Sequence, residues 1–213
     1  MGTITESFGN LSEYLLAEYK KPKRRPAAEL LLSSVVKPFL PSAIRCGAGT
    51  ITDIKDRQVG PFDVVAATDR YPPFSEGKAA TYLSDGVVFA LQARNWSESD
   101  LTQFGELSRQ MKALERKTKK PASSLAVSFE PLPLRDLSQF LNSKAGQAVD
   151  GILCVGQHVI LRNASGLYGD PDRVPFVTEQ PGPEALKAFT FYLLELSHAA
   201  LGQPFGLADY QHL

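Results

Sequence analysis

Three polar residues within two apolar stretches are the strongest candidates for a functional site in this sequence. Asp63 lies inside the apolar run of residues 61–65, and Gln92 and Arg94 close a second run that begins at residue 86. Because side chains alternate across a strand, Gln92 and Arg94 share one face. Buried polar groups need partners. Two partner sets fit: an Arg94–Asp63 ion pair with Gln92 hydrogen-bonded to either residue, or a divalent cation together with a phosphodiester.

Other kinds of chemistry lack the residues or the spacing that they need. The sequence has no phosphate-binding loop ending in Gly-Lys-Ser/Thr, no dinucleotide-binding glycine pattern and no Gly-x-Ser-x-Gly motif. Cys46 and Cys154, the only cysteines, have no activating base beside them and are expected to be reduced, as in the cytoplasm. The histidines are too scattered for a metal site, at His158, His198 and His212.

Basic side chains gather in two stretches of a chain that has no net charge. Lys+Arg and Asp+Glu number 23 each, which argues against binding nucleic acid by bulk charge and leaves local contacts. Residues 112–120 either complement the dipole of a predicted helix or hold a phosphate backbone. The other stretch, here called the basic arm, is either a solvated loop or a phosphate-contacting segment. Its basic residues are Lys20, Lys21, Lys23, Arg24 and Arg25.

One aromatic residue stands close to the polar group. Trp96, the only tryptophan, follows Arg94 by two positions and precedes a predicted helix that Ser97 can cap. Its ring either stacks on a nucleic-acid base or packs half-buried beside that helix. The sequence therefore leaves Trp96 as a candidate contact for nucleic acid.

The elements that must position these residues alternate between helix and strand. Apolar periodicity predicts helices over residues 10–19, 26–41, 97–117, 135–141 and 183–201. Apolar runs predict strands over residues 45–53, 62–67, 86–93 and 123–129, and two short strands around Gly156 within 150–162. Residues 69–85 are expected to form an irregular loop that could include a short edge strand. A strand, a crossover helix and a second strand predict an α/β fold with a mixed central sheet flanked by helices.

Length and composition bound the organisation of the chain. The 213 residues, 43% hydrophobic and 22% charged, suit one globular fold with a single core. We expect an N-terminal helix and basic linker over residues 1–25 and one α/β domain over 26–213. No signal peptide or membrane-spanning stretch is recognised, which predicts a soluble cytoplasmic protein with no membrane partner. The apolar helix over 183–201 is expected either to fill the core or to pack against a second copy in a homo-oligomer.

The order of these motifs resembles a little-characterised bacterial family with the PD-(D/E)xK nuclease fold. In that family a helix with a glutamate leads into Leu-Pro, a Gly-x-Gly strand, a strand with an aspartate and a strand that ends in Glu-x-Lys. The matching motifs here are Glu29, Leu40-Pro41, Gly47-Ala48-Gly49, Phe62-Asp63-Val64-Val65 and Val87-Val88-Phe89-Ala90-Leu91-Gln92-Ala93-Arg94. The resemblance is closest over residues 10–118, follows the order of elements beyond them, and implies a restriction-endonuclease-like core.

In such nucleases the aspartate and the glutamate hold Mg²⁺, and the lysine activates the attacking water. The resemblance gives Asp63 the first role, and it places Gln92 at the glutamate position and Arg94 at the lysine position. An amide oxygen can bind a hard cation without adding charge, so Asp63, Gln92 and Glu29 would hold Mg²⁺, or Mn²⁺ in its place. Arginine can clamp a phosphate and stabilise developing charge, but it cannot accept a proton.

These departures lead to three alternatives for function. The first is a nuclease-like protein with a degenerate site and weak or lost cleavage, which binds DNA or a partner in bacterial defence or genome maintenance. The second is an active Mg²⁺-dependent endonuclease with Asp63, Gln92, Arg94 and Glu29 as catalytic residues. The third is a non-enzymatic α/β interaction module or oligomer subunit. In the two nuclease alternatives, the basic arm and Trp96 would contact the nucleic acid.

Overall fold

The fold is built on one long mixed sheet. A computed structural model describes residues 3–23, 25–76, 79–118, 121–163, 176–179 and 182–203. Strands of these residues lie in the order β3-β4-β1-β2-β5-β6-β7-β8-β9. The β1–β4, β5–β6 and β6–β7 pairs are parallel and the other neighbours are antiparallel. The strand bounds are β1 (Ile44–Thr52), β2 (Gln58–Thr68), β3 (Phe74–Glu76), β4 (Ala79–Leu83), β5 (Val87–Ala93), β6 (Ser123–Ser128), β7 (Gly151–Cys154), β8 (His158–Arg162) and β9 (Phe176–Glu179).

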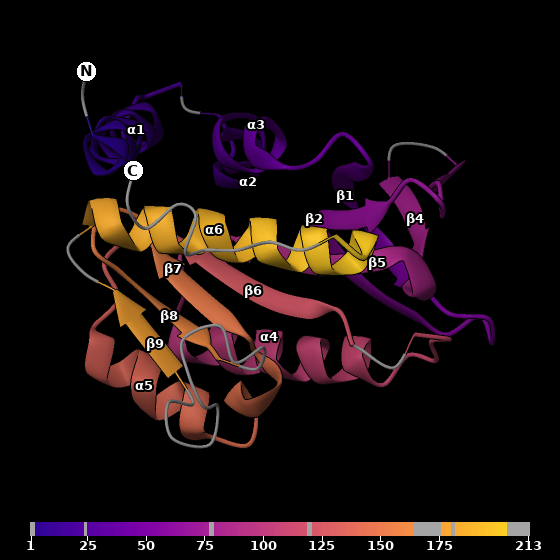
Figure 1. The fold of residues 1–213 in the computed structure, drawn as a ribbon. Helices are drawn as coiled ribbons and strands as arrows, with labels where there is room; N and C mark the ends of the chain where they lie inside the picture. Colours follow the sequence, from indigo (N-terminus) through magenta and orange to yellow (C-terminus); the bar gives the residue numbers. More distant parts are fainter. Residues whose placement is uncertain are drawn as a thin grey trace.

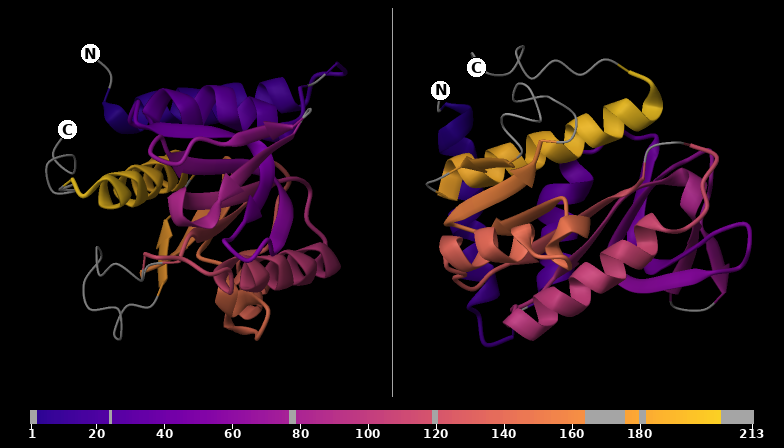
Figure 2. Two further views of the ribbon diagram at one scale, coloured as in Figure 1. Left: turned by 90° about the vertical axis from the view of Figure 1, so that its right-hand side faces the viewer. Right: turned by 90° about the horizontal axis from the view of Figure 1, so that it is seen from below.

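Helices cover both faces of this sheet (Figure 1). One face carries α1 (Ile4–Tyr19), α2 (Ala27–Leu31), α3 (Lys37–Phe39) and α6 (Gly182–Leu201), and the opposite face carries α4 (Glu98–Lys112) and α5 (Leu134–Asn142), as the turned views in Figure 2 also show. Each face has its own cluster of buried apolar side chains, with Phe89 in the first and Phe104 in the second. This confirms the predicted α/β fold with a mixed sheet flanked by helices.

The helices form where the sequence predicts them, but their ends differ. The first helix begins at Ile4 and not at residue 10, because the Thr3 hydroxyl accepts a hydrogen bond from the backbone N–H of Glu6 at 3.2 Å. The helix predicted over 26–41 is a run of α2, a π-helical turn at Leu32–Val36 and α3. α4 begins with the expected cap at Ser97 but ends at Lys112, short of residue 117.

The strands extend beyond the predicted apolar runs. β2 begins at Gln58 and therefore includes the polar and proline positions that precede residue 62. Residues 69–85, expected to form an irregular loop that could include a short edge strand, contain two strands, β3 and β4, which form one edge of the sheet. Residues 150–162 form the two predicted strands, β7 and β8, which pair antiparallel across the turn at Gly156. The left-handed φ of 78° at Gly156 explains why glycine suits that turn.

The apolar helix α6 fills the core of one sheet face. Phe189, Tyr192 and Leu193 are buried in the cluster that α6 shares with α1, and the Thr5 hydroxyl donates to Glu184 at 2.9 Å. A hollow of about 300 Å³ remains between α1, α3 and α6, with Phe8, Phe39 and Leu194 among its lining residues. Within the described ranges, no helix combines the length and the apolar character that crossing a bilayer requires.

Candidate functional site

Pairing between β2 and β5 brings Asp63 beside Gln92. The β2–β5 ladder ends with Val64 opposite Leu91, and Asp63 and Gln92 are the next residue of each strand beyond it. The Asp63 Oδ2 atom accepts a hydrogen bond from the backbone N–H of Ala93 at 2.8 Å. The carboxylate is thus fixed against the end of β5, and Oδ1 is the oxygen that a cation could take.

Gln92 is held by the chain itself. Its side chain is in the sheet interior, with the residue 7% exposed, and its Nε2 atom donates a hydrogen bond to the carbonyl oxygen of Pro61 at 3.0 Å. A glutamate in this place would have no proton to donate and would face the Pro61 carbonyl with a negative charge. The amide therefore satisfies a contact that a carboxylate could make only with a cation nearby.

Arg94 turns away from Asp63. Its backbone N–H donates to the Val127 carbonyl at 3.1 Å, and its guanidinium carbon lies 5.3 Å from the centre of the Trp96 ring. Hydrogen bonds from Ser97, and then the charge of Arg94, lower the pKa of Asp100 in the first turn of α4. Among the described residues, no ion pair joins Arg94 to Asp63. The mutual ion pair weighed from the sequence is therefore not formed, and the guanidinium is exposed.

Trp96 packs into the core beside the candidate site. The residue is 7% exposed, its Nε1 atom donates to the Val127 carbonyl at 2.9 Å, and its ring lies 5.2 Å from that of Phe104. The indole is buried on the side of Phe104 and α4, so its ring packs in the core and is not exposed for stacking on a base. We therefore leave Trp96 out of the proposed contacts with nucleic acid.

Glu29 lies on α2, which packs against β5 on the face shared with α1. The side chain is exposed, and no hydrogen bond or ion pair among the described residues joins it to Asp63 or Gln92. In the same residues, no three His, Cys, Asp or Glu side chains gather as a metal site would require. Asp63 Oδ1 and the Gln92 amide oxygen are the donors in place, with one negative charge between them. Such a set fits weak binding of Mg²⁺ that a substrate phosphate would complete.

The basic arm begins beside Arg94. The hydroxyl of Tyr19, the last residue of α1, donates to Asn95 Oδ1 at 2.6 Å, so the arm leaves the fold next to the segment that follows β5. Lys20 and Lys23 are exposed. The remaining described side chains of the arm have partners on α1: Lys21 pairs with Glu18, and Arg25 donates to the Tyr14 hydroxyl at 3.2 Å. Arg24 lies outside the described residues.

The second basic stretch is tied to the fold. Lys112 pairs with the buried carboxylate of Asp150 at 2.7 Å, and Arg116 donates to the Val87 carbonyl at 2.6 Å. Burial lowers the pKa of Arg116, and the charge of Asp85 partly opposes that shift. These two cations are engaged inside the protein, and Lys119 and Lys120 lie outside the described residues. Lys112 and Arg116 thus have structural roles and are not free phosphate contacts.

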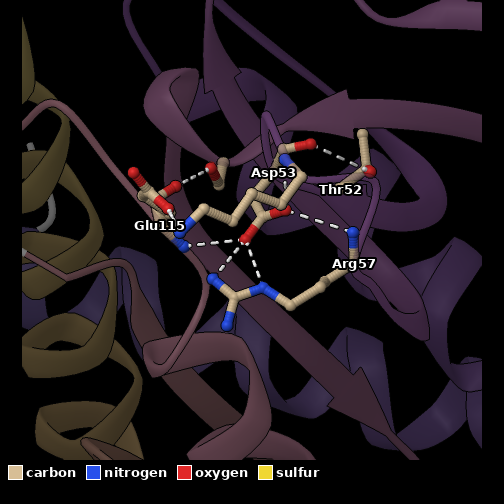
Figure 3. Close-up of polar contacts among 6 residues, drawn as sticks. Thr52, Asp53, Arg57 and Glu115 are labelled. Atoms are coloured by element: carbon tan, nitrogen blue, oxygen red, sulfur yellow. Dashed lines mark hydrogen bonds and ion pairs between the residues drawn. The ribbon is translucent and has the colours of Figure 1, made fainter.

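A buried carboxylate that the sequence did not single out fixes this second stretch (Figure 3). The Asp53 side chain, 0% exposed, accepts hydrogen bonds from the backbone N–H groups of Lys55, Arg57 and Glu115 and from Arg57 Nε, at 2.8–3.1 Å. Burial alone would raise the pKa of this carboxyl, but the bonds from Glu115 and Arg57 outweigh it and hold the pKa well below its usual range. The β1–β2 turn is thereby joined to the end of α4.

The depressed pKa of Asp53 predicts how stability depends on pH. A carboxyl with a folded pKa below its unfolded value of about 3.9 contributes stability that is complete above that value and is lost as pH falls through the folded pKa. We expect Asp53→Asn to lower the melting temperature by several degrees at pH 7, with a gap to wild type that narrows toward pH 2. Asp56→Asn, an exposed change in the same turn, is the matched control. A difference in melting temperature that stays constant from pH 7 to pH 2 would contradict the stabilising role of the ionised Asp53.

Comparison with known proteins supports the fold. No family model and no curated protein sequence matches the chain. Among solved structures, it is similar to E. coli MS115-1 NucC in its cAAA-bound form, with a TM-score of 0.77 and 15% identity over 94% of this chain and 92% of that one. The cAAA-bound NucC of P. aeruginosa ATCC27853 gives 0.74 and 14% identity, with coverages of 94% and 92%. The apo form of E. coli NucC gives 0.70 and 16% identity, with 91% of each chain covered.

These neighbours have a restriction-endonuclease-like fold, so the fold implied by the resemblance is confirmed. At 14–16% identity the likeness establishes the arrangement of elements alone. What this chain does with the arrangement depends on its own residues, Asp63 in β2 and Gln92 and Arg94 at the end of β5.

Proposed function

We propose that this chain is a PD-(D/E)xK nuclease-like protein that binds DNA beside Asp63 of β2 and the end of β5, with weak or lost cleavage. The observation that carries the proposal is the pair of hydrogen bonds that join Gln92 to the Pro61 carbonyl and Asp63 to the Ala93 N–H. These bonds give Asp63 Oδ2 and Gln92 Nε2 partners within the protein, so neither atom needs a metal. A site built for tight Mg²⁺ binding would instead hold negative charges close together that only the cation could neutralise.

Arg94 supports the same conclusion. A guanidinium stays protonated, so it cannot take a proton from an attacking water as a lysine of lowered pKa can. Its exposed position over Trp96 leaves its N–H groups available for two oxygens of a phosphodiester. Arg94 is therefore a residue for holding the DNA backbone and for stabilising charge on a phosphate, with the proton transfer left unassisted.

The basic arm supplies the rest of the DNA contact. Lys20 and Lys23 are exposed where the chain leaves α1, and the Tyr19–Asn95 hydrogen bond sets that point beside Arg94. Phosphate contacts from such side chains would give binding that is independent of base sequence and weakens steeply with salt. A chain of zero net charge can bind DNA in this way because the charge is local.

Metal binding in this proposal is weak and depends on substrate. Mg²⁺, or Mn²⁺ in its place, would polarise the phosphoryl oxygen when bound. Asp63 supplies the only carboxylate we assign, and the Gln92 amide oxygen supplies a second, uncharged ligand. Glu29, on the α2 side of the sheet and away from the face of Gln92, is not assigned as a ligand.

The setting we propose is bacterial defence, in the cytoplasm, where the free thiols Cys46 and Cys154 stay reduced. The NucC likeness supports it. Because that protein is described with cAAA and without it, DNA binding and cleavage by this chain should be measured in the presence and absence of cAAA. Inactivity under one condition alone would then not be mistaken for a lost site.

Isothermal titration of Mg²⁺ tests the proposed site directly. Wild type should bind Mg²⁺ weakly, and Asp63→Asn should remove that binding while it keeps an oxygen that accepts from the Ala93 N–H. Asp69→Asn, an exposed change just beyond β2, is the control. DNA binding should persist in both variants because Arg94 and the arm carry it. Mg²⁺ binding that survives Asp63→Asn, or wild-type protein that neither binds nor nicks DNA, would refute the proposal.

An interaction module or homo-oligomer is the second candidate. The hollow between α1, α3 and α6 is lined mainly by apolar side chains, and Phe39 at its rim is exposed. A second copy seated there would make the protein an oligomer. Light scattering coupled to size exclusion, over a wide range of protein concentration, distinguishes that assembly from a monomer.

A further inference from the structure

Three residues after β5 form a short segment that carries Arg94, Asn95 and Trp96. Two hydrogen bonds hold this segment on β6. The carbonyl of Val127 accepts one from the Arg94 backbone N–H at 3.1 Å and one from the Trp96 Nε1–H at 2.9 Å. These bonds fix the two ends of the segment on β6. The side chain of Asn95, between them, is exposed apart from its bond to Tyr19.

Tyr19 is the residue that reaches Asn95 from the helical layer. It is 5% exposed, and its ring stacks on Phe129 with centroids 4.8 Å apart and planes 24° from parallel. Phe129 directly follows β6, so the strand that supports Arg94 and Trp96 also supports the Tyr19 ring. The hydroxyl is thereby aimed at Asn95 Oδ1, at 2.6 Å. Because its ring is buried and stacked, Tyr19 holds its hydroxyl in a fixed position, and the hydrogen bond in turn restrains the exposed Asn95 side chain.

The Tyr19–Asn95 hydrogen bond also restrains the start of the basic arm, because Tyr19 directly precedes it. Tyr19 ends α1, and Lys20 begins the basic arm at the next residue. One hydrogen bond therefore ties the origin of the arm to the residue that follows Arg94. Without it, each group of positive charge would move with its own element, and a phosphate backbone would have to order both on binding.

The structure assigns Tyr19 the role of a positioning residue, whose hydroxyl holds Asn95 so that Arg94 and the basic arm present their charges to one stretch of DNA backbone. This inference rests on the proposed DNA-binding function. It adds to that function a residue that touches neither DNA nor metal and acts through Asn95.

Tyr19→Phe tests the assignment because it removes the hydroxyl and keeps the stacked ring. Loss of one such bond should weaken DNA binding about fivefold. Asn95→Ala should have the same effect, and the double variant should be no worse than either single change, because one bond is lost in all three. Tyr82→Phe, at a buried tyrosine of the other core cluster, is the matched control. Affinity is measured with a short labelled duplex at fixed salt.

Quenching of Trp96 fluorescence by acrylamide gives a readout that needs no DNA. Trp96 is the only tryptophan and lies next to Asn95, so its accessibility reports on the segment. Tyr19→Phe and Asn95→Ala should each raise quenching, whereas Tyr82→Phe should not. Unchanged quenching in Tyr19→Phe, or additive effects on affinity in the double variant, would overturn the assignment. Wild type that fails to bind DNA would refute the proposed function, and quenching would then decide the Tyr19 link by itself.

Discussion

Plasmid nicking is expected to rise at least about a hundredfold when Gln92→Glu and Arg94→Lys are combined, since one change restores a charged metal ligand and the other a proton acceptor. With Glu at position 92, a second carboxylate would be added beside Asp63 where the β2–β5 ladder ends. With Lys at position 94, the compact ammonium could lower its pKa near the metal and the attacking water. Conversion of supercoiled plasmid to the nicked form, with Mg²⁺ and with or without cAAA, measures the gain.

A third change provides the control for this gain. Asp63→Asn added to the pair should return nicking to the wild-type level, because the remaining carboxylate cannot hold the ion alone. If the triple variant nicks as well as the double, the activity comes from elsewhere. If the double variant binds Mg²⁺ and DNA but never nicks, the departures at positions 92 and 94 are not what limits cleavage.

The same substitution carries a cost that can be measured separately. Gln92→Glu deletes the donor to the Pro61 carbonyl and leaves a buried carboxylate facing that oxygen, which should cost about 1–3 kcal/mol in the absence of Mg²⁺. Added Mg²⁺ should recover this loss, as a ligand that binds only the folded state does. Thermal unfolding with and without Mg²⁺ therefore checks the geometry of the site even before any DNA is added.

Removal of charge from the basic arm should produce the second large effect. Lys20→Ala, Lys23→Ala and Arg25→Ala together should weaken DNA binding by about a hundredfold at low salt and reduce the salt slope by about three. The reason is that DNA releases about one fewer counterion on binding for each cation that is removed from the protein. Fluorescence anisotropy of a labelled duplex, repeated over a range of salt concentrations, gives both quantities.

A matched set of charges on the opposite face separates local from bulk attraction. Arg109→Ala, Arg135→Ala and Lys144→Ala remove three exposed cations at α4, α5 and just beyond α5, on the face away from α1 (Figure 1). This variant should bind DNA nearly as wild type does. Equal losses in the two triple variants would mean that net charge, and not the arm, governs the interaction.

The sequence predicted the strands that carry the site because their interiors are apolar. The run that ends at Ala93 is buried throughout, as expected of a central strand, and Asp63 and Gln92 stand out within such runs. Their mutual position follows from the β2–β5 register, which pairing fixes and which no local pattern encodes. Of the two partner sets that the sequence left open, the Arg94–Asp63 ion pair is not formed, and the guanidinium lies over the Trp96 ring.

Two further features, the partner of Gln92 and the role of Asp53, could not be predicted from the sequence because both depend on tertiary contacts. The partner of Gln92 is a backbone carbonyl, at Pro61, and any residue could have supplied it. Asp53 gains its importance from Glu115, which is far away in sequence, although the nearby Arg57 in a turn after an apolar strand is a weak signal of it. The edge strand β9 has only four residues, which is too short for an alternating pattern to stand out, so the sequence did not predict that strand.

The packing of α1 on α6 sets the order in which the protein can be completed during translation. Thr5 and Glu184, which are hydrogen-bonded across that contact, are separated by 179 positions, so a ribosome needs roughly ten to thirty seconds to make the second after the first. β2 and β5 are made early and can pair while synthesis continues. Through that interval Phe8 and Leu15 have no α6 to cover them. A chain that stops before residue 182 would therefore carry the strands of the site together with an uncovered apolar helix, and would be a substrate for chaperones before it could meet DNA.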